Sequence, residues 1–152
     1  MYLLTGCYSF TGSALPQYLR TVRIPLVENR TVNTSVDNNL HRSLTDEFVS
    51  ASGLRMVNSN AHSELRVTLL NFANTMDAYA RRGSDDYDVT QFRVSIRLEA
   101  VFFNNVKSEE IYSGKINAWG VYDRDGGTEA EAVDKAVEMA VREIINETVS
   151  DW

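Results

Sequence analysis

The residues from Phe92 to Phe102 alternate between apolar and polar side chains, and this pattern constrains the fold more than any other feature of the chain. The even positions hold the apolar residues Phe92, Val94, Ile96, Leu98, Ala100 and Phe102. Successive side chains of a β-strand point to opposite faces of the sheet, so this run predicts a strand with one buried and one open face. Asn104-Asn105 then predicts a turn, and residues 111–122 predict a second strand paired with the first.

Two other segments show the same alternation and are predicted to be strands, namely residues 18–27 and 64–77. Their predicted inward positions are Val22, Ile24 and Leu26 in the first and Leu65, Val67 and Leu69 in the second. Residues 81–88 are rich in charge and contain one glycine, which predicts a loop. The chain therefore supplies four strands.

Two helices are predicted from apolar residues at helical spacing. In residues 36–52 an apolar side chain recurs at every fourth position, and Gly53 suits the helix C-terminus. The second helix starts after Thr128, which forms a capping-box pattern with Glu131 three residues later. Its predicted inward face consists of Val133, Val137, Ala140, Val141, Ile144 and Thr148.

These elements occur in the order β-α-β-β-β-α, which predicts an α+β fold. The simplest arrangement is a two-layer sandwich in which both helices pack on one face of a four-stranded sheet. A chain of 152 residues fits one domain. We assign residues 18–152 to this domain. Residues 1–6 and 7–17 are assigned to two N-terminal segments outside it, which are described below.

The open face of the sheet is predicted to be basic. Strand parity places on it the side chains of Arg23, Arg66, Arg93, Arg97 and Lys115, with Glu99 as its one acid. We interpret these cations as candidates for binding an anionic lipid such as lipopolysaccharide, and Phe103 and Trp119 as candidate interface anchors. The alternative is an ordinary solvated sheet face. The formal charge of −6 argues against a protein that binds nucleic acid through its phosphates.

The N-terminus contains the only cysteine of the chain. Leu4-Thr5-Gly6-Cys7 matches a bacterial lipobox, in which a signal peptide is cut before a cysteine that then carries lipid. Residues 1–6 are therefore predicted to be the remnant of a signal peptide, and residues 7–17 a lipidated tether. The alternative is that Cys7 is a small buried residue.

No catalytic motif is present, so the chain is predicted not to be an enzyme. It contains no nucleophile elbow, phosphate-binding loop or zinc-protease motif, and its two histidines stand apart in sequence. Asp123 and Asp125 begin like a calcium loop, but Gly127 occupies the third ligand position. We therefore expect no metal and no cofactor other than covalent lipid on Cys7.

From the lipobox onward the sequence resembles the LptE family of lipopolysaccharide-assembly lipoproteins. The resemblance rests on Cys7-Tyr8-Ser9-Phe10-Thr11-Gly12, on residues 21–31 (TVRIPLVENRT), on Glu64-Leu65-Arg66-Val67-Thr68, on residues 92–97 (FRVSIR), and on the closing residues 148–152 (TVSDW). No single piece is very specific, but their order and spacing together are.

The resemblance implies a lipid-anchored protein on the periplasmic side of the outer membrane. It implies that the chain plugs an LptD-type β-barrel, assists the assembly of that barrel, and supports lipopolysaccharide insertion at the cell surface. The alternative is another periplasmic lipoprotein accessory, for example a peptidoglycan-synthase activator or a secretion component. Such proteins can share a strand and loop like residues 24–31.

Overall fold

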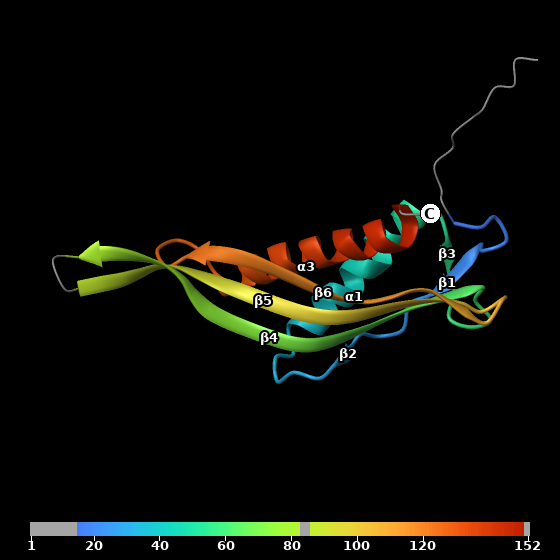
Figure 1. Ribbon diagram of the computed structural model, residues 1–152, viewed down its shortest axis with the longest axis horizontal. Helices are drawn as coiled ribbons and strands as arrows, with labels where there is room; N and C mark the ends of the chain where they lie inside the picture. Colours follow the sequence, from blue (N-terminus) through green and yellow to red (C-terminus); the bar gives the residue numbers. More distant parts are fainter. Residues whose placement is uncertain (1–14, 83–85, 151–152) are drawn as a thin grey trace, which may run out of the picture.

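The computed structural model describes residues 15–82 and 86–150. One mixed sheet forms the first layer, and the helices lie on one side of it (Figure 1). The long strands β4 (Ser63–Arg82), β5 (Asp86–Asn104) and β6 (Glu109–Asp123) form an antiparallel meander. The short strands are β1 (Thr21–Arg23), β2 (Glu28–Asn29) and β3 (Arg55–Met56). The strand order is β3-β1-β4-β5-β6, and β2 also pairs with β4. The predicted α+β sandwich is therefore confirmed.

The sheet has six strands, and the prediction of four was wrong. The additional strands are β2 (Glu28–Asn29) and β3 (Arg55–Met56), which form short parallel pairings with β4 and β1. Two paired residues are too few to produce a visible alternation of apolar side chains. Only their neighbours in the folded sheet identify these segments as strands, because the pairing depends on contacts that are distant in sequence.

The first predicted strand is also shorter than expected, since β1 covers only Thr21–Arg23. Pro25 cannot donate a hydrogen bond to a sheet ladder, and regular pairing stops before it. Val22 and Ile24 are buried as predicted. After the proline the alternation of buried and exposed side chains shifts by one residue. Leu26, which was predicted to face inward, is 78% exposed, and Val27 is buried instead.

The loop predicted at residues 81–88 is largely absent from the described structure, where β4 extends to Arg82 and β5 starts at Asp86. The β4–β5 hairpin therefore projects beyond the last pair of β5 and β6, Gln91 with Asp123 (Figure 1). A register shift between Leu69 and Asn71 also changes the parity of β4. After this bulge Phe72 lies opposite Ile96 on the helix-covered face, whereas uninterrupted alternation placed it on the open face.

The first helical segment comprises α1 (Val36–Ser43), the π-helix η1 (Leu44–Phe48) and α2 (Val49–Ser52). Its predicted apolar residues Val36, Leu40, Leu44 and Phe48 are all fully buried. A spacing of four residues drifts by about 40° per step on a regular α-helix, which has 3.6 residues per turn. The wider turns of η1 reduce this drift, so all four side chains reach the sheet. Gly53 ends the segment with a φ of +70°, as predicted.

The second helical segment comprises α3 (Glu129–Ile145) and the π-helix η2 (Asn146–Ser150). Thr128 and Glu131 form both hydrogen bonds of the predicted capping box. α3 lies close to β6 because Gly120 has no side chain. A Cβ atom at Gly120 would lie 2.9 Å from Cβ of Lys135 and would overlap the carbonyl of Ala132.

The core fills the space between the helices and the even-numbered face of β5. Phe48 from η1 meets Phe102 from β5 edge to face, with ring centroids 5.5 Å apart. Val94, Leu98 and Ala100 are fully buried, and every predicted inward residue of α3 is buried as well. The parity prediction for β5 is therefore confirmed, and the opposite face carries the polar candidates.

Candidate functional site

Three of the five predicted cations on the open sheet face are already bound to carboxylates. Arg23 on β1 and Arg66 on β4 both pair with Glu64, at Nη1–Oε2 and Nε–Oε1 distances of 2.8 Å and 2.5 Å. Glu64 has the same strand parity as Arg66, so it lies on the same face. The prediction that Glu99 is the one acid of this face was wrong.

The third paired cation is Arg93 on β5. Its Nε lies 2.8 Å from Oδ1 of Asp77, next to a register shift that follows Met76 in β4. The guanidinium carbon lies 5.7 Å from the ring centroid of Trp119, which is within the range of a cation–π contact. Arg93 is thus held between a carboxylate and an indole, and the carboxylate of Asp77 balances part of its charge.

Arg97 and Lys115 are different, because within the described residues neither makes an ion pair. Both are exposed. Arg97 lies opposite Asn117, and Lys115 lies opposite Glu99, so the two cations are diagonal neighbours on β5 and β6. Of the five predicted residues, these two offer the cationic groups that are available to a ligand.

The two predicted aromatic anchors both lie on the odd-numbered side of their strands. Trp119 is 44% exposed, and it is the larger apolar surface of the pair. Phe103 is half-buried and lies opposite Glu64 and Glu110 on the neighbouring strands. Part of its ring is therefore covered. Trp119 therefore fits the role of an interface anchor better than Phe103 does.

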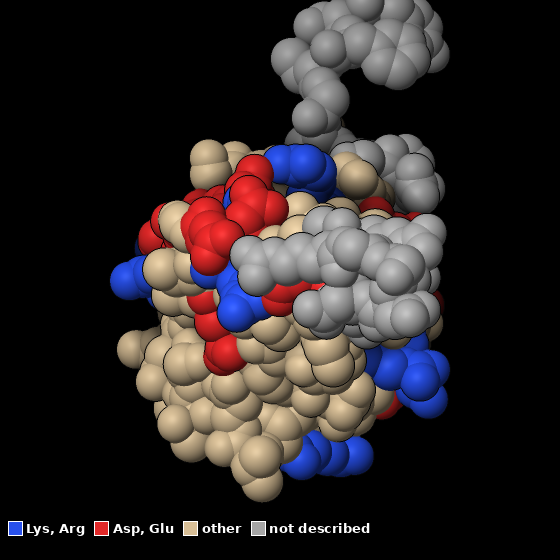
Figure 2. Space-filling model, turned by 90° about the vertical axis from the view of Figure 1, so that its left-hand side faces the viewer, with Lys and Arg blue, Asp and Glu red and all other residues tan. Residues whose placement is uncertain are grey.

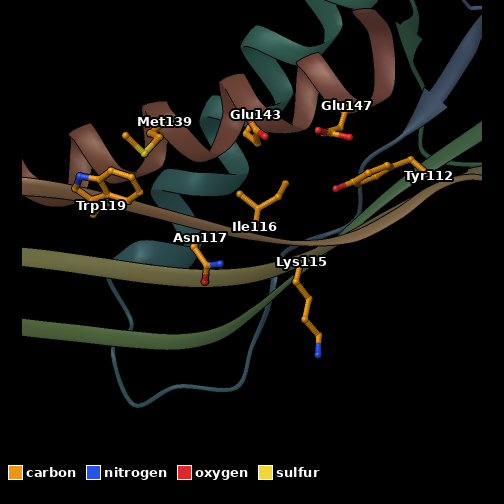
Figure 3. Close-up of a pocket in the computed structure, with 8 residues that line it drawn as sticks. All are labelled: Tyr112, Lys115, Ile116, Asn117, Trp119, Met139, Glu143 and Glu147. Atoms are coloured by element: carbon orange, nitrogen blue, oxygen red, sulfur yellow. The ribbon is translucent and has the colours of Figure 1, made fainter. Parts of the chain in front are cut away.

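A groove of about 530 Å³ follows the free edge of β6 beneath α3, and sequence reasoning did not anticipate it (Figure 3). Ile116, Trp119 and Met139 form its apolar wall, and Glu143 on α3 and Glu147 on η2 form its acidic side. Lys115 also lines it, although Figure 3 shows its side chain directed to the other face of the sheet. β6 and α3 follow one another in the sequence, and the groove forms where they pack against each other in the fold.

Tyr112 lies at the acidic end of this groove, and its hydroxyl lies beneath Glu147 (Figure 3). Desolvation raises the pKa of Tyr112 above its ordinary value of 10.0, and the charges of Glu147 and Glu143 raise the pKa further. Both causes favour the neutral phenol. The groove therefore has a negative potential at this end, which favours a cation and opposes an anion.

The end of the molecule that carries the β4–β5 hairpin is unevenly charged. Figure 2 shows acidic side chains gathered in the upper part of this view and mostly uncharged side chains below them. The first turns of α3, on the upper side of the sheet in Figure 1, expose Glu129, Glu131 and Asp134. The negative charge of the chain is thus partly concentrated on the helical layer.

The described residues offer no group of three or more histidine, cysteine, aspartate or glutamate side chains that could hold a metal ion. None of the helices within residues 15–82 and 86–150 is long and apolar enough to cross a membrane. Cys7 and the whole predicted lipobox lie outside the described residues. The lipid anchor therefore stays a prediction from the sequence.

The family model described as LptE, lipopolysaccharide assembly, matches residues 19–148. This match covers most of the chain and includes every strand and α-helix described above. The chain belongs to the LptE family. The resemblance inferred from the sequence is thereby confirmed, and the family relates this protein to lipopolysaccharide assembly. No curated protein sequence matches the chain.

Solved structures confirm the fold of this LptE-family chain. The hypothetical protein CT253 from Chlamydia trachomatis is 12% identical, with a TM-score of 0.59 over 83% of this chain and 93% of that one. Lipoprotein GNA1162 from Neisseria meningitidis is 9% identical, with a TM-score of 0.52 over 84% and 96%. The PelC dodecamer from Paraburkholderia phytofirmans is 10% identical, with a TM-score of 0.55 over 91% and 96%. At these identities the likeness concerns the fold alone.

Proposed function

We propose that this protein is an outer-membrane lipoprotein that plugs an LptD-type β-barrel, assists its assembly and supports lipopolysaccharide insertion at the cell surface. The observation that carries the proposal is the family match over residues 19–148. The role requires recognition and positioning but no bond-breaking step, so we propose that the protein is not an enzyme. The two-layer domain suits it, because a rigid sheet backed by helices presents a fixed surface to the polar lumen of a barrel.

We further propose that lipid on Cys7 anchors the domain to the periplasmic side of the outer membrane. A single acyl chain gives only marginal membrane binding, whereas several chains give stable anchoring. Mass spectrometry of the N-terminus of full-length protein extracted from membranes tests this step. A lipid adduct on Cys7 supports the anchor, and an unmodified thiol contradicts it.

We propose that direct contact with lipopolysaccharide on the open sheet face depends on Arg97 and Lys115. Neither residue forms an ion pair within the described residues, whereas Arg23 and Arg66 share Glu64 and Arg93 pairs with Asp77. The double variant Arg97→Glu/Lys115→Glu is expected to weaken lipopolysaccharide binding at least tenfold. The matched control Lys135→Glu/Arg142→Glu on α3 carries the same charge change. Equal losses in both variants would refute a role for the sheet face.

Affinity purification of the lipidated protein from detergent-solubilised membranes tests the function as a whole. Recovery of a large β-barrel protein supports the proposed plug. Recovery of a peptidoglycan synthase or a secretion component without a barrel would instead support an accessory role outside lipopolysaccharide assembly. A quantitative readout is the amount of folded barrel in cells depleted of this protein, which is expected to fall.

A further inference from the structure

The outer edge of β6 is an unpaired strand edge of unusual regularity. From Tyr112 to Tyr122 the pairing of β6 with β5 shows no register shift, whereas β4 contains three. β6 lies last in the strand order, so no strand pairs with its other side within the described sheet. Proteins usually interrupt such edges with bulges, prolines or several charges, because a long regular edge recruits further strands. Lys115 is the one charged residue between Tyr112 and Tyr122.

Two hydrogen bonds define which residues of β6 face outward. The amide of Arg124 donates to the carbonyl of Thr90 on β5, at 3.0 Å. The carbonyl of Val121 instead accepts a bond from Nζ of Lys135 on α3, at 3.3 Å. Alternate residues of an antiparallel strand direct both backbone groups to the same side, so the odd-numbered residues face away from β5. Among these outward residues, Ser113, Lys115, Asn117 and Trp119 have backbone N–H and C=O groups without a hydrogen-bond partner in the described structure.

Lys115, Asn117 and Trp119, three of these four residues, line the groove beneath α3 (Figure 3). A strand added to β6 would occupy it, with alternate side chains pointing toward α3. Near Ile116 and Met139 those side chains meet an apolar wall, and near Tyr112 they meet Glu143 and Glu147. The two glutamates are four residues apart on a helix, or about 6 Å along its axis. Residues i and i+2 of a strand are about 6.7 Å apart, so two basic side chains at this spacing match both carboxylates.

We propose that the edge of β6 binds an extended segment of another protein by strand addition, antiparallel to β6. The segment has the pattern apolar-x-apolar-x-basic-x-basic, with the basic residues at the Glu143 and Glu147 end. Main-chain hydrogen bonds to Ser113, Lys115, Asn117 and Trp119 provide affinity, and the groove beneath α3 provides specificity. The proposal stands independently of the barrel-plug function, because it follows from the edge, the groove and the charges.

The probe is the acetylated and amidated peptide Thr-Val-Thr-Leu-Thr-Arg-Thr-Arg-Thr. In the proposed register its threonine amides face β6, and its valine, leucine and arginine side chains face α3. Binding is followed by isothermal titration calorimetry and by hydrogen exchange of individual amides. We expect at least tenfold slower exchange at Lys115, Asn117 and Trp119. Methylation of the inner threonine amides is expected to abolish binding, whereas methylation of the valine and leucine amides leaves it within about threefold.

The charge contribution is tested with Glu143→Lys/Glu147→Lys, which is expected to weaken the peptide at least tenfold. The matched control Asp46→Lys/Glu47→Lys makes the same charge change on exposed residues of η1 and is expected to have little effect. Absence of binding, equal loss in both variants, or binding without protection of the β6 amides would overturn the proposal. Protection that rises with protein concentration in the absence of peptide would also overturn it, because a second copy would then occupy the edge.

Discussion

Gly120 on β6 is predicted to be required for space and not for its backbone conformation. Its φ lies outside the left-handed region that favours glycine, so alanine suits the strand itself. An added Cβ would nevertheless lie 2.9 Å from the carbonyl carbon of Ala132 and from Cβ of Lys135, and closer still to the carbonyl oxygen of Ala132. Ordinary contacts between carbon atoms are about 3.5–4.0 Å, and the carbonyl oxygen is the closest atom, so α3 must retreat from the sheet by roughly 1 Å or more.

That displacement sets the expected cost of Gly120→Ala. Adding a methyl group to a closely packed interface costs typically about 1–3 kcal/mol. Replacing glycine by alanine at a compatible position offsets about 0.4–1 kcal/mol of this, because it restricts the unfolded chain. We therefore expect a loss of about 1–2 kcal/mol in the free energy of unfolding. For a chain of this length, that loss lowers the Tm by roughly 2–8 °C.

Gly114 provides the matched control, because it lies on the same strand and has the same parity. A Cβ there would contact the phenol end of Tyr112, which can rotate away, and not the backbone of a helix. Gly114→Ala is expected to stay within about 0.5 kcal/mol of the wild type. Urea unfolding followed by circular dichroism measures both variants. If Gly120→Ala is as stable as Gly114→Ala, the inferred close packing of α3 on β6 is incorrect.

Three further predictions address the core, a helix cap and a titrating group. Phe102→Ala removes the ring that packs against Phe48 in a fully buried site, and it is expected to cost about 3–5 kcal/mol in urea unfolding. Thr128→Ala removes the hydroxyl that accepts from the amide of Glu131, and it is expected to cost about 1 kcal/mol, with Thr128→Ser as the control. The raised pKa of Tyr112 means that the folded state favours the neutral phenol, so stability is lost as the pH rises above 10. Tyr112→Phe should therefore lose less stability than the wild type between pH 7 and pH 11; an equal loss would contradict the assigned cause.

The faces of the long strands could be predicted because side-chain alternation is a local property of a strand. The even-numbered residues of β5 are buried from Val94 to Phe102, as their pattern indicates. The same parity rule fails in β4 after Leu69, because a bulge leaves no sequence signature there and reverses the orientation of Phe72. Strands β2 and β3 were missed for a related reason, since two-residue pairings carry no periodic signal.

The charge of the open face was only partly predictable. Parity places Glu64 on the same side as Arg66, so the pairing of that carboxylate with Arg23 and Arg66 could have been found from the sequence. The pairing of Arg93 with Asp77 could not, because the bulge after Leu69 turns the odd-numbered residues of β4 to the open face. The groove could not be predicted either. One of its walls is a strand and the other a helix, and the periodicity of each segment does not show how the two pack together.

Strand β6 links the two proposed binding surfaces. Lys115 projects from its open face and the Trp119 ring lies beside Met139 at the groove, and the outward amides of both residues belong to the edge proposed to bind a segment of another protein. Binding of that segment would extend the sheet next to Lys115 and restrict the Trp119 ring, which also contacts Arg93. A ligand on the open face and a segment at the edge would therefore influence each other through these two residues, and each would change the affinity of the other by the same factor.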